Sequence, residues 1–290
     1  MSEIKTLSQS TGVLYVVATP IGNLADISQR ALDVLSAVDL VAAEDTRRTG
    51  RLLAHFGISA RLWSNHEHNE GQMIPRLLER LAKGEDVALV SDAGTPLISD
   101  PGYPVVQAAR SAGYRVVPIP GANAAICALS AAGLPSDRFL FLGFPPRTER
   151  KRRDWLSGVV AEPGTLVFYE SGNRVLATLI DLSMMLGGGR RTLIARELTK
   201  RFETFLVGTL ESLPAMLRED SDQQKGEMVI LVEGNRERAD GDAEGDRVVR
   251  ILARELPLKQ AVVLAAEITG AKKNRLYQKA LAGKDGGRQG

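Results

Sequence analysis

Short apolar segments alternate with longer amphipathic segments through the first 120 residues of the chain. Five of the apolar segments have the length and composition of buried strands. They span residues 13–18, 40–43, 61–64, 87–90 and 115–119. The longer segments repeat apolar residues at helical spacing, as Ile74, Leu77 and Leu81 do, and predict helices. This alternation favours an α/β fold with a mostly parallel sheet that is covered on both faces.

A second group of apolar segments begins after an Ala-rich helix that ends at Gly133. The strands predicted in this group span residues 139–143, 166–169, 192–195, 205–207 and 228–232. Several of them follow one another at hairpin-like spacing, which predicts a mixed sheet, and a helix is expected from Arg174 to about Leu186. The chain is therefore expected to contain two α/β domains, residues 11–120 and 121–234.

The end of the chain has a different pattern. Residues 234–247 are polar and Gly-rich, a composition typical of a linker. Pro257 opens an apolar helix that ends at Gly270, and a basic helix follows. Residues 245–284 are thus predicted to form a small helical appendage, either a nucleic-acid-binding module or a solvated helical hairpin.

Composition indicates the class of protein and excludes some kinds of site. A hydrophobic content of 44% with 25% charged residues is typical of a globular protein. Without a run of 18 apolar residues or a signal-peptide pattern, we expect a cytoplasmic protein with no membrane contact. The single Cys127 excludes an internal disulfide and a thiolate metal cluster, and its apolar neighbours predict burial. The net charge of +2 is too small to indicate nucleic acid, so the basic run at 147–153 is more informative.

The segment 87–102 is the most informative part of the chain. Its apolar first part predicts a buried strand, and Gly94, Pro96, Pro101 and Gly102 then impose an irregular polar loop. A long polar loop after a buried strand is typical of ligand sites at the carboxyl ends of strands. Similar polar segments follow other strands, and we expect them to converge with it on one cleft. They are residues 19–23, 121–125, 169–173 and 196–200.

Common site motifs are absent from the sequence. It contains no G-x-x-x-x-G-K-[ST] phosphate loop, no G-x-G-x-x-G between a strand and a helix, and no G-x-S-x-G elbow. His66, Glu67 and His68 lack a third ligand nearby, so a solvated loop is favoured there and no metal site is predicted. The start of the Ala-rich helix, at 122–124, is expected to leave backbone amides open to an acceptor.

Four segments resemble a known family. They are VATPIGNL at 17–24, AAEDTR at 42–47, VSDAGTPLISDPG at 90–102 and ARELTK at 195–200. They are similar to the small-subunit ribosomal RNA methyltransferase I family, which belongs to the tetrapyrrole-methylase-like class of S-adenosylmethionine enzymes. The resemblance runs from Val13 to Val232, and the C-terminal helices resemble the tail of the same family. The chain departs from the family pattern at Ala122, where Pro is usual, and at Gly172 and Asn173, where Pro-His is usual.

The resemblance implies 2′-O-methylation of a cytidine ribose in small-subunit ribosomal RNA, either as naked RNA or in an assembled subunit. It implies S-adenosylmethionine as the cofactor, a cofactor cleft between two α/β domains, and a homodimer. By motif matching, the residues that would line the cofactor are Pro20, Asp92, Ala93, Gly94, Thr95, Ile98, Asn123, Ala124 and Glu170.

Methyl transfer to a hydroxyl needs an acceptor for the proton. The candidates are Lys200, Glu197, Asp100 and Glu170. A lysine base would have to be neutral. A charged Lys200, which Glu197 could hold in place, would instead stabilise the developing alkoxide, and a further alternative is a surface cation that pairs with a phosphate. We also expect phosphate contacts from basic residues in two segments. These are Arg147, Arg150, Lys151, Arg152 and Arg153, with Lys272, Lys273 and Arg275 near the end of the chain.

Two other interpretations stay open from the sequence. One keeps the cofactor but makes the acceptor a tetrapyrrole or another small molecule; the basic segments count against it. The other is a non-catalytic RNA-binding factor for ribosome assembly. Binding of S-adenosylmethionine, followed by methyl transfer to RNA, would separate these interpretations.

Overall fold

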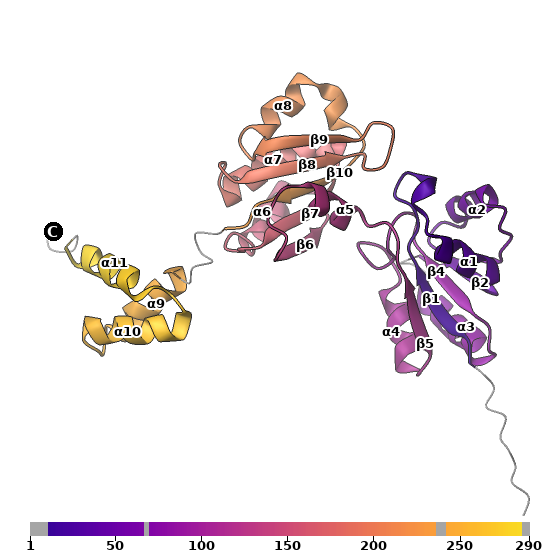
Figure 1. Cartoon of the computed structure of the whole chain (residues 1–290), viewed down its shortest axis with the longest axis horizontal. Helices are drawn as coiled ribbons and strands as arrows, with labels where there is room; N and C mark the ends of the chain where they lie inside the picture. Colours follow the sequence, from indigo (N-terminus) through magenta and orange to yellow (C-terminus); the bar gives the residue numbers. More distant parts are fainter. Residues whose placement is uncertain (1–10, 67–69, 236–241, 286–290) are drawn as a thin grey trace, which may run out of the picture.

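The structure is a computed structural model, and it describes residues 11–66, 70–235 and 242–285. The first sheet has five strands in the order β3-β2-β4-β1-β5 (Figure 1). Its strands are β1 (Val13–Val17), β2 (Leu40–Ala43), β3 (Leu62–Ser64), β4 (Val87–Val90) and β5 (Arg115–Ile119). All of its strand pairs are parallel, as the alternation of strand and helix predicted.

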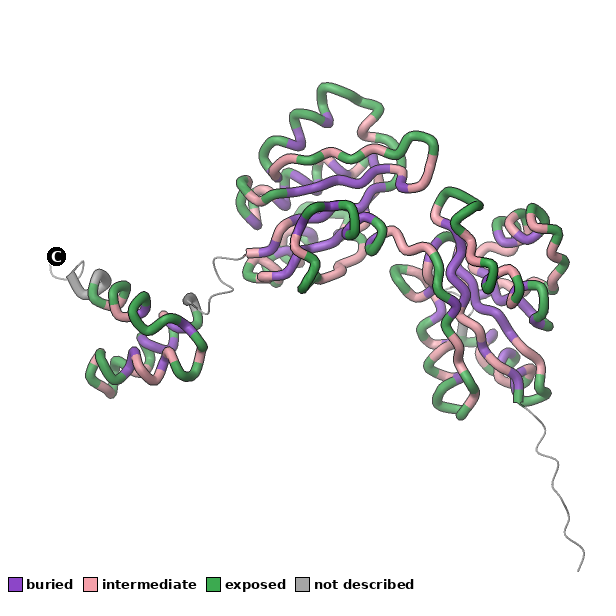
Figure 2. The backbone as a smooth tube through the Cα atoms, viewed as in Figure 1, coloured by how far each residue is buried: buried purple, intermediate pink, exposed green. Residues whose placement is uncertain are grey.

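Helices cover both faces of the first sheet. They are α1 (Gln29–Ala37), α2 (Thr46–His55), α3 (Glu70–Ala82) and α4 (Tyr103–Ser111). Leu89 packs in the apolar cluster that α3 and α4 contribute to, and Val90 packs in the cluster of α1 and α2. Successive residues of β4 therefore face opposite helical layers, which explains why the segment is apolar throughout. Figure 2 shows the strands mostly buried and the outer surfaces of the helices exposed.

The second sheet is mixed, as predicted. Its strand order is β6-β7-β10-β8-β9, and only the β6–β7 pair is parallel. The strands are β6 (Phe139–Gly143), β7 (Thr165–Ser171), β8 (Arg191–Arg196), β9 (Thr204–Thr209) and β10 (Glu227–Val232). The expected fold class, two α/β units with a helical appendage, is confirmed.

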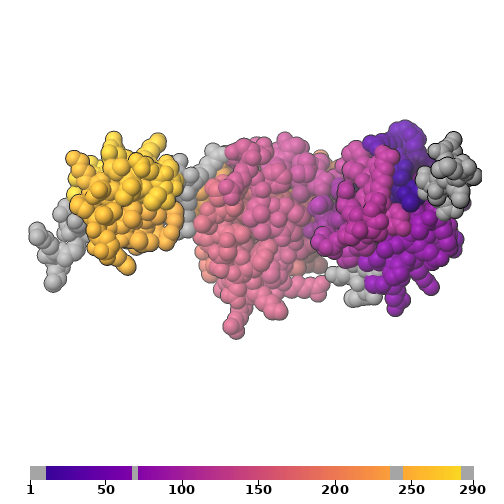
Figure 3. Space-filling model, turned by 90° about the horizontal axis from the view of Figure 1, so that it is seen from below, coloured from indigo at the N-terminus to yellow at the C-terminus, as the bar shows by residue number. Residues whose placement is uncertain are grey.

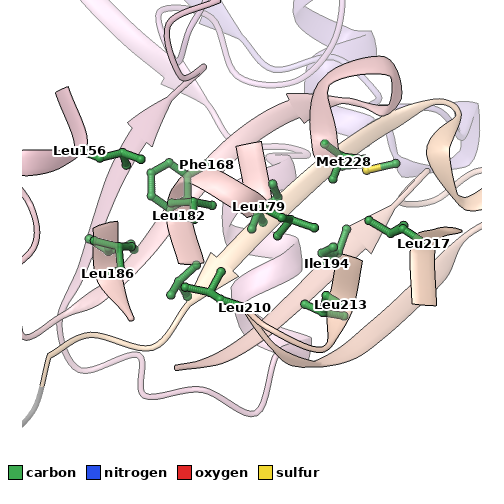
Figure 4. Close-up of a cluster of buried hydrophobic side chains, with 14 residues drawn as sticks. Leu156, Phe168, Leu179, Leu182, Leu186, Ile194, Leu210, Leu213, Leu217 and Met228 are labelled. Atoms are coloured by element: carbon green, nitrogen blue, oxygen red, sulfur yellow. The ribbon is translucent and has the colours of Figure 1, made fainter. Parts of the chain in front are cut away.

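One face of the second sheet carries the largest apolar cluster, drawn in Figure 4. Helices α6 (Glu149–Ser157), α7 (Gly172–Leu186) and α8 (Leu213–Glu219) contribute to it, and a short 3-10 helix, η2 (Ser221–Gln224), follows α8. Phe168 of β7 and Ile194 of β8 are fully buried in this cluster. Burial of such side chains stabilises the fold by about 1.5–3 kcal/mol each, which anchors the strands whose ends form the site.

Helix α5 (Ala124–Ala131) covers the opposite face of the second sheet. Its buried residues Ala125, Ala128 and Leu129 follow helical spacing and pack in a cluster with Val167. Cys127 lies outside this spacing and is exposed, so the prediction of a buried cysteine is wrong. The apolar composition around Cys127 did not distinguish the two sides of the helix.

The C-terminal helices form a packed unit of their own. They are α9 (Asp242–Leu252), α10 (Leu258–Thr269) and α11 (Lys273–Asp285). Val249, Val262 and Leu276, one from each helix, share a small apolar core. The chain therefore forms a packed unit of three helices here and not a solvated hairpin of two. The linker expected to reach residue 247 instead gives way to α9 at Asp242. Figure 3 shows these helices as a lobe at one end of the molecule.

The basic run at 147–153 leads into α6, and one of its members is buried. Arg152 is 4% exposed, and its Nε donates to Asp181 Oδ2 at 2.7 Å. Arg153 donates to the other oxygen of Asp181, also at 2.7 Å. Arg152 therefore joins α6 to α7 and does not face solvent, so its assignment as a phosphate contact is wrong.

Replacing Asp181 by alanine should lower the free energy of unfolding by about 3–5 kcal/mol, because Arg152 would remain buried without a counter-charge. Urea denaturation followed by circular dichroism measures this change. Asp154 is exposed on α6 and provides the control, since its replacement should change stability by less than about 0.5 kcal/mol. Equal effects of the two substitutions would contradict the account of α6.

Candidate active site

A cavity of about 390 Å³ lies between the two sheets, and residues of both line it. From the first sheet it receives the loop after β4, and from the second it receives the ends of β7 and β8 and the start of β10. It brings together most of the residues predicted from the sequence. These are Asp92, Ala93, Gly94, Thr95, Ile98, Asp100, Asn123, Ala124, Glu170, Glu197 and Lys200. Pro20 instead lines an adjoining cavity of about 440 Å³.

Backbone contacts fix the loop after β4 above the sheet. Thr19 and Gly94 exchange two backbone hydrogen bonds, of 2.9 and 3.0 Å, and the Thr95 hydroxyl donates to the carbonyl of Ala122 at 3.1 Å. Leu97 and Ser99 have φ values of 73° and 67°, which are costly for residues with a side chain. Such conformations persist where the surrounding structure imposes them, and they concentrate at functional sites.

Two backbone amides in the first turn of α5 have hydrogen-bond acceptors within the protein. The side chain of Asn123 accepts a hydrogen bond from the amide of Ile126 at 3.1 Å. The hydroxyl of Tyr169 accepts one from the amide of Ala125 at 3.2 Å. A cap and a neighbouring strand therefore supply acceptors for these two amides, whereas the expectation of open amides concerns residues 122–124 and stays a prediction.

Carboxylates line the side of the cavity that belongs to the first sheet. Asp92 accepts a hydrogen bond from the amide of Asp45 at 3.0 Å, and its own amide donates to Glu44 at 3.2 Å. Burial raises the pKa of Asp100 to about 6, the charges of Glu44 and Asp92 act in the same direction, and a hydrogen bond with Ser91 opposes them. Asp100 is thus a carboxylate at neutral pH whose proton affinity is unusually high.

Lys200 reaches the cavity from a strained loop after β8. Its Nζ contacts Glu197 Oε1 and Glu227 Oε2, each at 2.8 Å. Burial acts to lower the pKa of Lys200, but hydrogen bonds to the two carboxylates outweigh it and raise the pKa above its ordinary value. Lys200 is therefore held as a cation here, which favours a role as a positive charge over the neutral lysine that a general base requires.

The backbone around Lys200 is held in place by neighbouring groups. Glu197 has a φ of 50° and also accepts a hydrogen bond from the amide of Glu227 at 2.9 Å. Arg196 donates to the carbonyls of Lys225 and Phe202, at 2.7 and 3.0 Å, and so stabilises the loop that carries Lys200. Because Glu197 is engaged on Lys200 and its pKa is lowered despite burial, Glu197 suits a positioning role better than that of a base.

Glu170 is also fully engaged, although it was a candidate base. Its Oε2 accepts from the hydroxyl of Thr178 at 2.6 Å, and its Oε1 accepts from the amide of Ser171 at 2.9 Å. Arg174 lies 3.3 Å from the same carboxylate and donates to the carbonyl of Pro145. Glu170 thus fixes the end of β7 and the segment before α6, and these contacts favour a structural role over that of a proton acceptor.

The remaining predicted residues lie outside the cavity. Arg147, just before α6, and Arg150 and Lys151 in its first turn are exposed, whereas Arg153 is half-buried and paired with Asp181. Lys272, Lys273 and Arg275 are exposed at the start of α11. Glu67 and His68 lie outside the described residues, and within the described residues no group of side chains could hold a metal ion. No helix in the described part of the chain is long and apolar enough to cross a membrane.

Several lining residues were not predicted. Glu44 lies in the AAEDTR segment, and Arg48 directly follows it. Because this segment comes after a strand, its position could have indicated both residues. Phe144 and Glu227 follow or begin strands of the second sheet without any turn motif. No local pattern marks them, because only the tertiary arrangement brings them to the cavity.

Comparisons with known proteins agree with this architecture. A family model described as Tetrapyrrole (Corrin/Porphyrin) Methylases matches residues 13–214, and one described as the RsmI C-terminal HTH domain matches residues 239–284. Among solved structures, the cobalt precorrin-4 methyltransferase CbiF has a TM-score of 0.57 at 16% identity, and the alignment covers 76% of this chain and 94% of that one. Diphthine synthase also has a TM-score of 0.57, at 17% identity, with 77% and 90% covered. These two likenesses show the fold.

Curated relatives are much more similar in sequence. The ribosomal RNA small subunit methyltransferase I of Escherichia coli O157:H7 is 56% identical over 282 residues, which span 97% of this chain and 99% of that protein. The protein of the same name from Pseudomonas aeruginosa is 56% identical over 276 residues, or 94% and 98% of the two chains. The chain therefore belongs to the tetrapyrrole methylase family and, within it, groups with the proteins named ribosomal RNA small subunit methyltransferase I.

Proposed function

We propose that the chain transfers a methyl group from S-adenosylmethionine to the 2′-hydroxyl of a cytidine ribose in small-subunit ribosomal RNA. The observation that carries the proposal is the cavity between the sheets, where Asp92 and Asp100 of the first sheet face Lys200 of the second. The name of the curated relatives supports ribosomal RNA as the substrate class. The ribose hydroxyl and the cytidine come from the sequence resemblance.

The residues of the cavity fit the proposed methyl donor. S-adenosylmethionine carries positive charge on its sulfonium and amino groups, and the carboxylates of Asp92 and Glu44 suit that charge. Ile98 and Phe144 are 37% and 56% exposed in the lining and offer apolar surface for an adenine ring. The proposed donor-binding residues are Asp92, Ala93, Gly94, Thr95, Ile98, Asn123, Ala124 and Glu170, with Pro20 at the adjoining cavity.

The donor, when bound, supplies an electrophilic methyl group. The chain must then position the ribose hydroxyl and provide an acceptor for its proton. Positioning of the two reacting centres supplies much of the rate in such a transfer. The ammonium of Lys200 would stabilise negative charge that develops on the ribose oxygen, while Glu197 and Glu227 hold it in place. Asp100, a carboxylate with a raised pKa, is the proposed acceptor of the hydroxyl proton.

Exposed basic residues at two places suit RNA phosphates. Arg147, Arg150 and Lys151 of the α6 segment and the start of α11 would supply these contacts. The match of residues 239–284 to a C-terminal HTH domain supports nucleic-acid binding by the α9–α11 unit. These features favour RNA over a tetrapyrrole as acceptor, and a homodimer and a cytoplasmic location remain parts of the proposal.

Replacing Asp92 by alanine should abolish binding of S-adenosylmethionine, because Asp92 lines the cavity and also positions the backbone of Asp45. Isothermal titration calorimetry measures the affinity, and methyl transfer to small subunits from cells that lack this chain tests the activity. Arg110→Ser, at an exposed site on α4, is the control and should leave affinity unchanged. An unchanged affinity in Asp92→Ala with an intact fold would contradict the donor site.

Replacing Lys200 by alanine should slow single-turnover methyl transfer by about 10²–10³-fold, the effect typical of losing one group that stabilises developing charge. Saturating S-adenosylmethionine and small subunits isolate the transfer step from binding. Lys200→Arg should keep substrate affinity but recover little rate, because a guanidinium does not match the space between Glu197 and Glu227. A near-normal rate in Lys200→Ala would assign Lys200 to RNA binding instead.

The rate of methyl transfer should rise with pH up to about 6 and then level off, because Asp100 must lose its proton before it can accept one. Lys200 adds no inflection in this range, since its raised pKa keeps it charged. Asp100→Asn should lose about 10²–10⁴-fold in rate and the low-pH limb of the profile with it. A flat profile between pH 5 and about 7 in the unaltered enzyme would exclude Asp100 as the base.

A further inference from the structure

A second cavity, of about 440 Å³, adjoins the candidate active site, and most of the proposed donor-binding residues line the first cavity and not this one. It lies between the loop after β1, helix α2 and the loop that carries Lys200. The two cavities share part of their lining, so they are neighbouring compartments of one cleft. The shared residues are Ile21, Arg48, Asp92, Ala93, Lys200 and Glu227.

Lys200 stands where the two compartments meet. It lines both cavities, and a Cβ built at Gly22 would lie 2.4 Å from its side chain, so the loop after β1 passes directly against it. Gly22 has a φ of 155° and thus combines a conformation that favours glycine with this close approach. A ligand in the second cavity would therefore meet the same ammonium that faces the donor cavity.

Helix α2 presents one face to the second cavity. Arg48, Thr49, Arg51 and Leu52 line it, which is the spacing of neighbours on a single helix face. The two arginines are three residues apart and both are exposed. Arg48 pairs with Asp92 at 3.3 Å, whereas Arg51 makes no ion pair or hydrogen bond within the described part of the chain.

Asp92 ties this helix to the donor cavity. Its Oδ1 accepts the amide hydrogen of Asp45, the residue that caps α2, and its Oδ2 faces Arg48. The start of α2 is therefore held at a fixed distance from the loop after β4. An anion bound by the arginines would be placed in a definite position relative to the donor cavity.

We propose that the second cavity receives the acceptor nucleotide, with Arg48 and Arg51 bound to phosphates next to the ribose that is methylated. This inference rests on the proposed function and extends it by assigning an acceptor subsite. The planar fork of arginine matches the geometry of a phosphate, and two such forks on one helix face suit consecutive phosphates of a strand. A cavity of this volume admits one nucleotide but not a duplex, so the target is a single-stranded or unstacked residue of the RNA.

The test compares Arg51→Ser with Arg47→Ser on the same helix. Arg47 is paired with Asp45, has an 85% exposed side chain and lines neither cavity. The probe is the small ribosomal subunit from cells that lack this chain, and its equilibrium dissociation constant is measured across a range of salt concentrations. Arg51→Ser should weaken binding by about tenfold or more and reduce the salt slope by about 0.7, the value for one phosphate contact on a single strand.

Three further measurements make the outcome specific. The affinity for S-adenosylmethionine should be unchanged in Arg51→Ser, because Arg51 lies outside the donor cavity. Arg51→Lys should keep the salt slope and recover only part of the affinity, since it retains the charge but loses the fork. Turnover measured alongside should show a raised KM for the subunit with kcat little changed.

The inference is overturned if Arg51→Ser binds the subunit as the unaltered protein does. It is also overturned if Arg47→Ser and Arg51→Ser weaken binding equally, since the effect would then belong to the general surface of α2. Failure of the proposed function looks different, because the unaltered protein would then transfer no methyl group. The binding comparison would still decide whether the second cavity holds RNA.

Discussion

The carboxylate of Asp92 is the interaction on which the site depends most. One oxygen accepts the amide hydrogen of Asp45 and the other faces Arg48, so a single side chain joins the loop after β4 to the start of α2. These two segments follow neighbouring parallel strands, whose carboxyl ends meet at one edge of the sheet. The position of Asp92 therefore fixes the wall that the two cavities share.

The second sheet positions a cation at the cavity, whereas the first sheet positions a carboxylate. There a cation, Lys200, is held between two carboxylates on a loop whose backbone is strained at Glu197 and Thr199. Arg196 braces that loop through backbone carbonyls, which keeps the ammonium at the junction of the cavities. The charges on the two sides of the cavity differ accordingly: Lys200 is held as a cation, and burial raises the pKa of the Asp100 carboxyl to about 6.

The sequence alone predicted those features of the fold that depend on residues close together in the chain. Strand 87–90 is apolar at every position because it is covered on both faces, and the Gly- and Pro-rich loop after it could not continue the strand. The hairpin spacing of the second sheet likewise predicted its mixed topology. Loops that follow parallel strands lie at one edge of the sheet. The sequence could therefore also predict that these residues converge on one cavity.

The predictions that were wrong depended on partners far along the chain. Arg152 belongs to a basic run, but its counter-charge, Asp181, is 29 residues away on another helix. The predicted linker included the first part of α9, up to residue 247, because that part is polar and contains glycine, while Val248 and Val249, which pack against α10 and α11, come later. Lys200 is held as a cation by Glu197 and also by Glu227, which comes from a different strand and carries no motif of its own.

The central claim is that this chain methylates a ribose of small-subunit ribosomal RNA in the cleft between its two sheets. Mass spectrometry of that RNA, from cells with and without the chain, tests the claim most directly. The account predicts that one 2′-O-methylated cytidine disappears when the chain is absent and returns when the unaltered chain is restored. Identical nucleoside profiles in the two cells would contradict it.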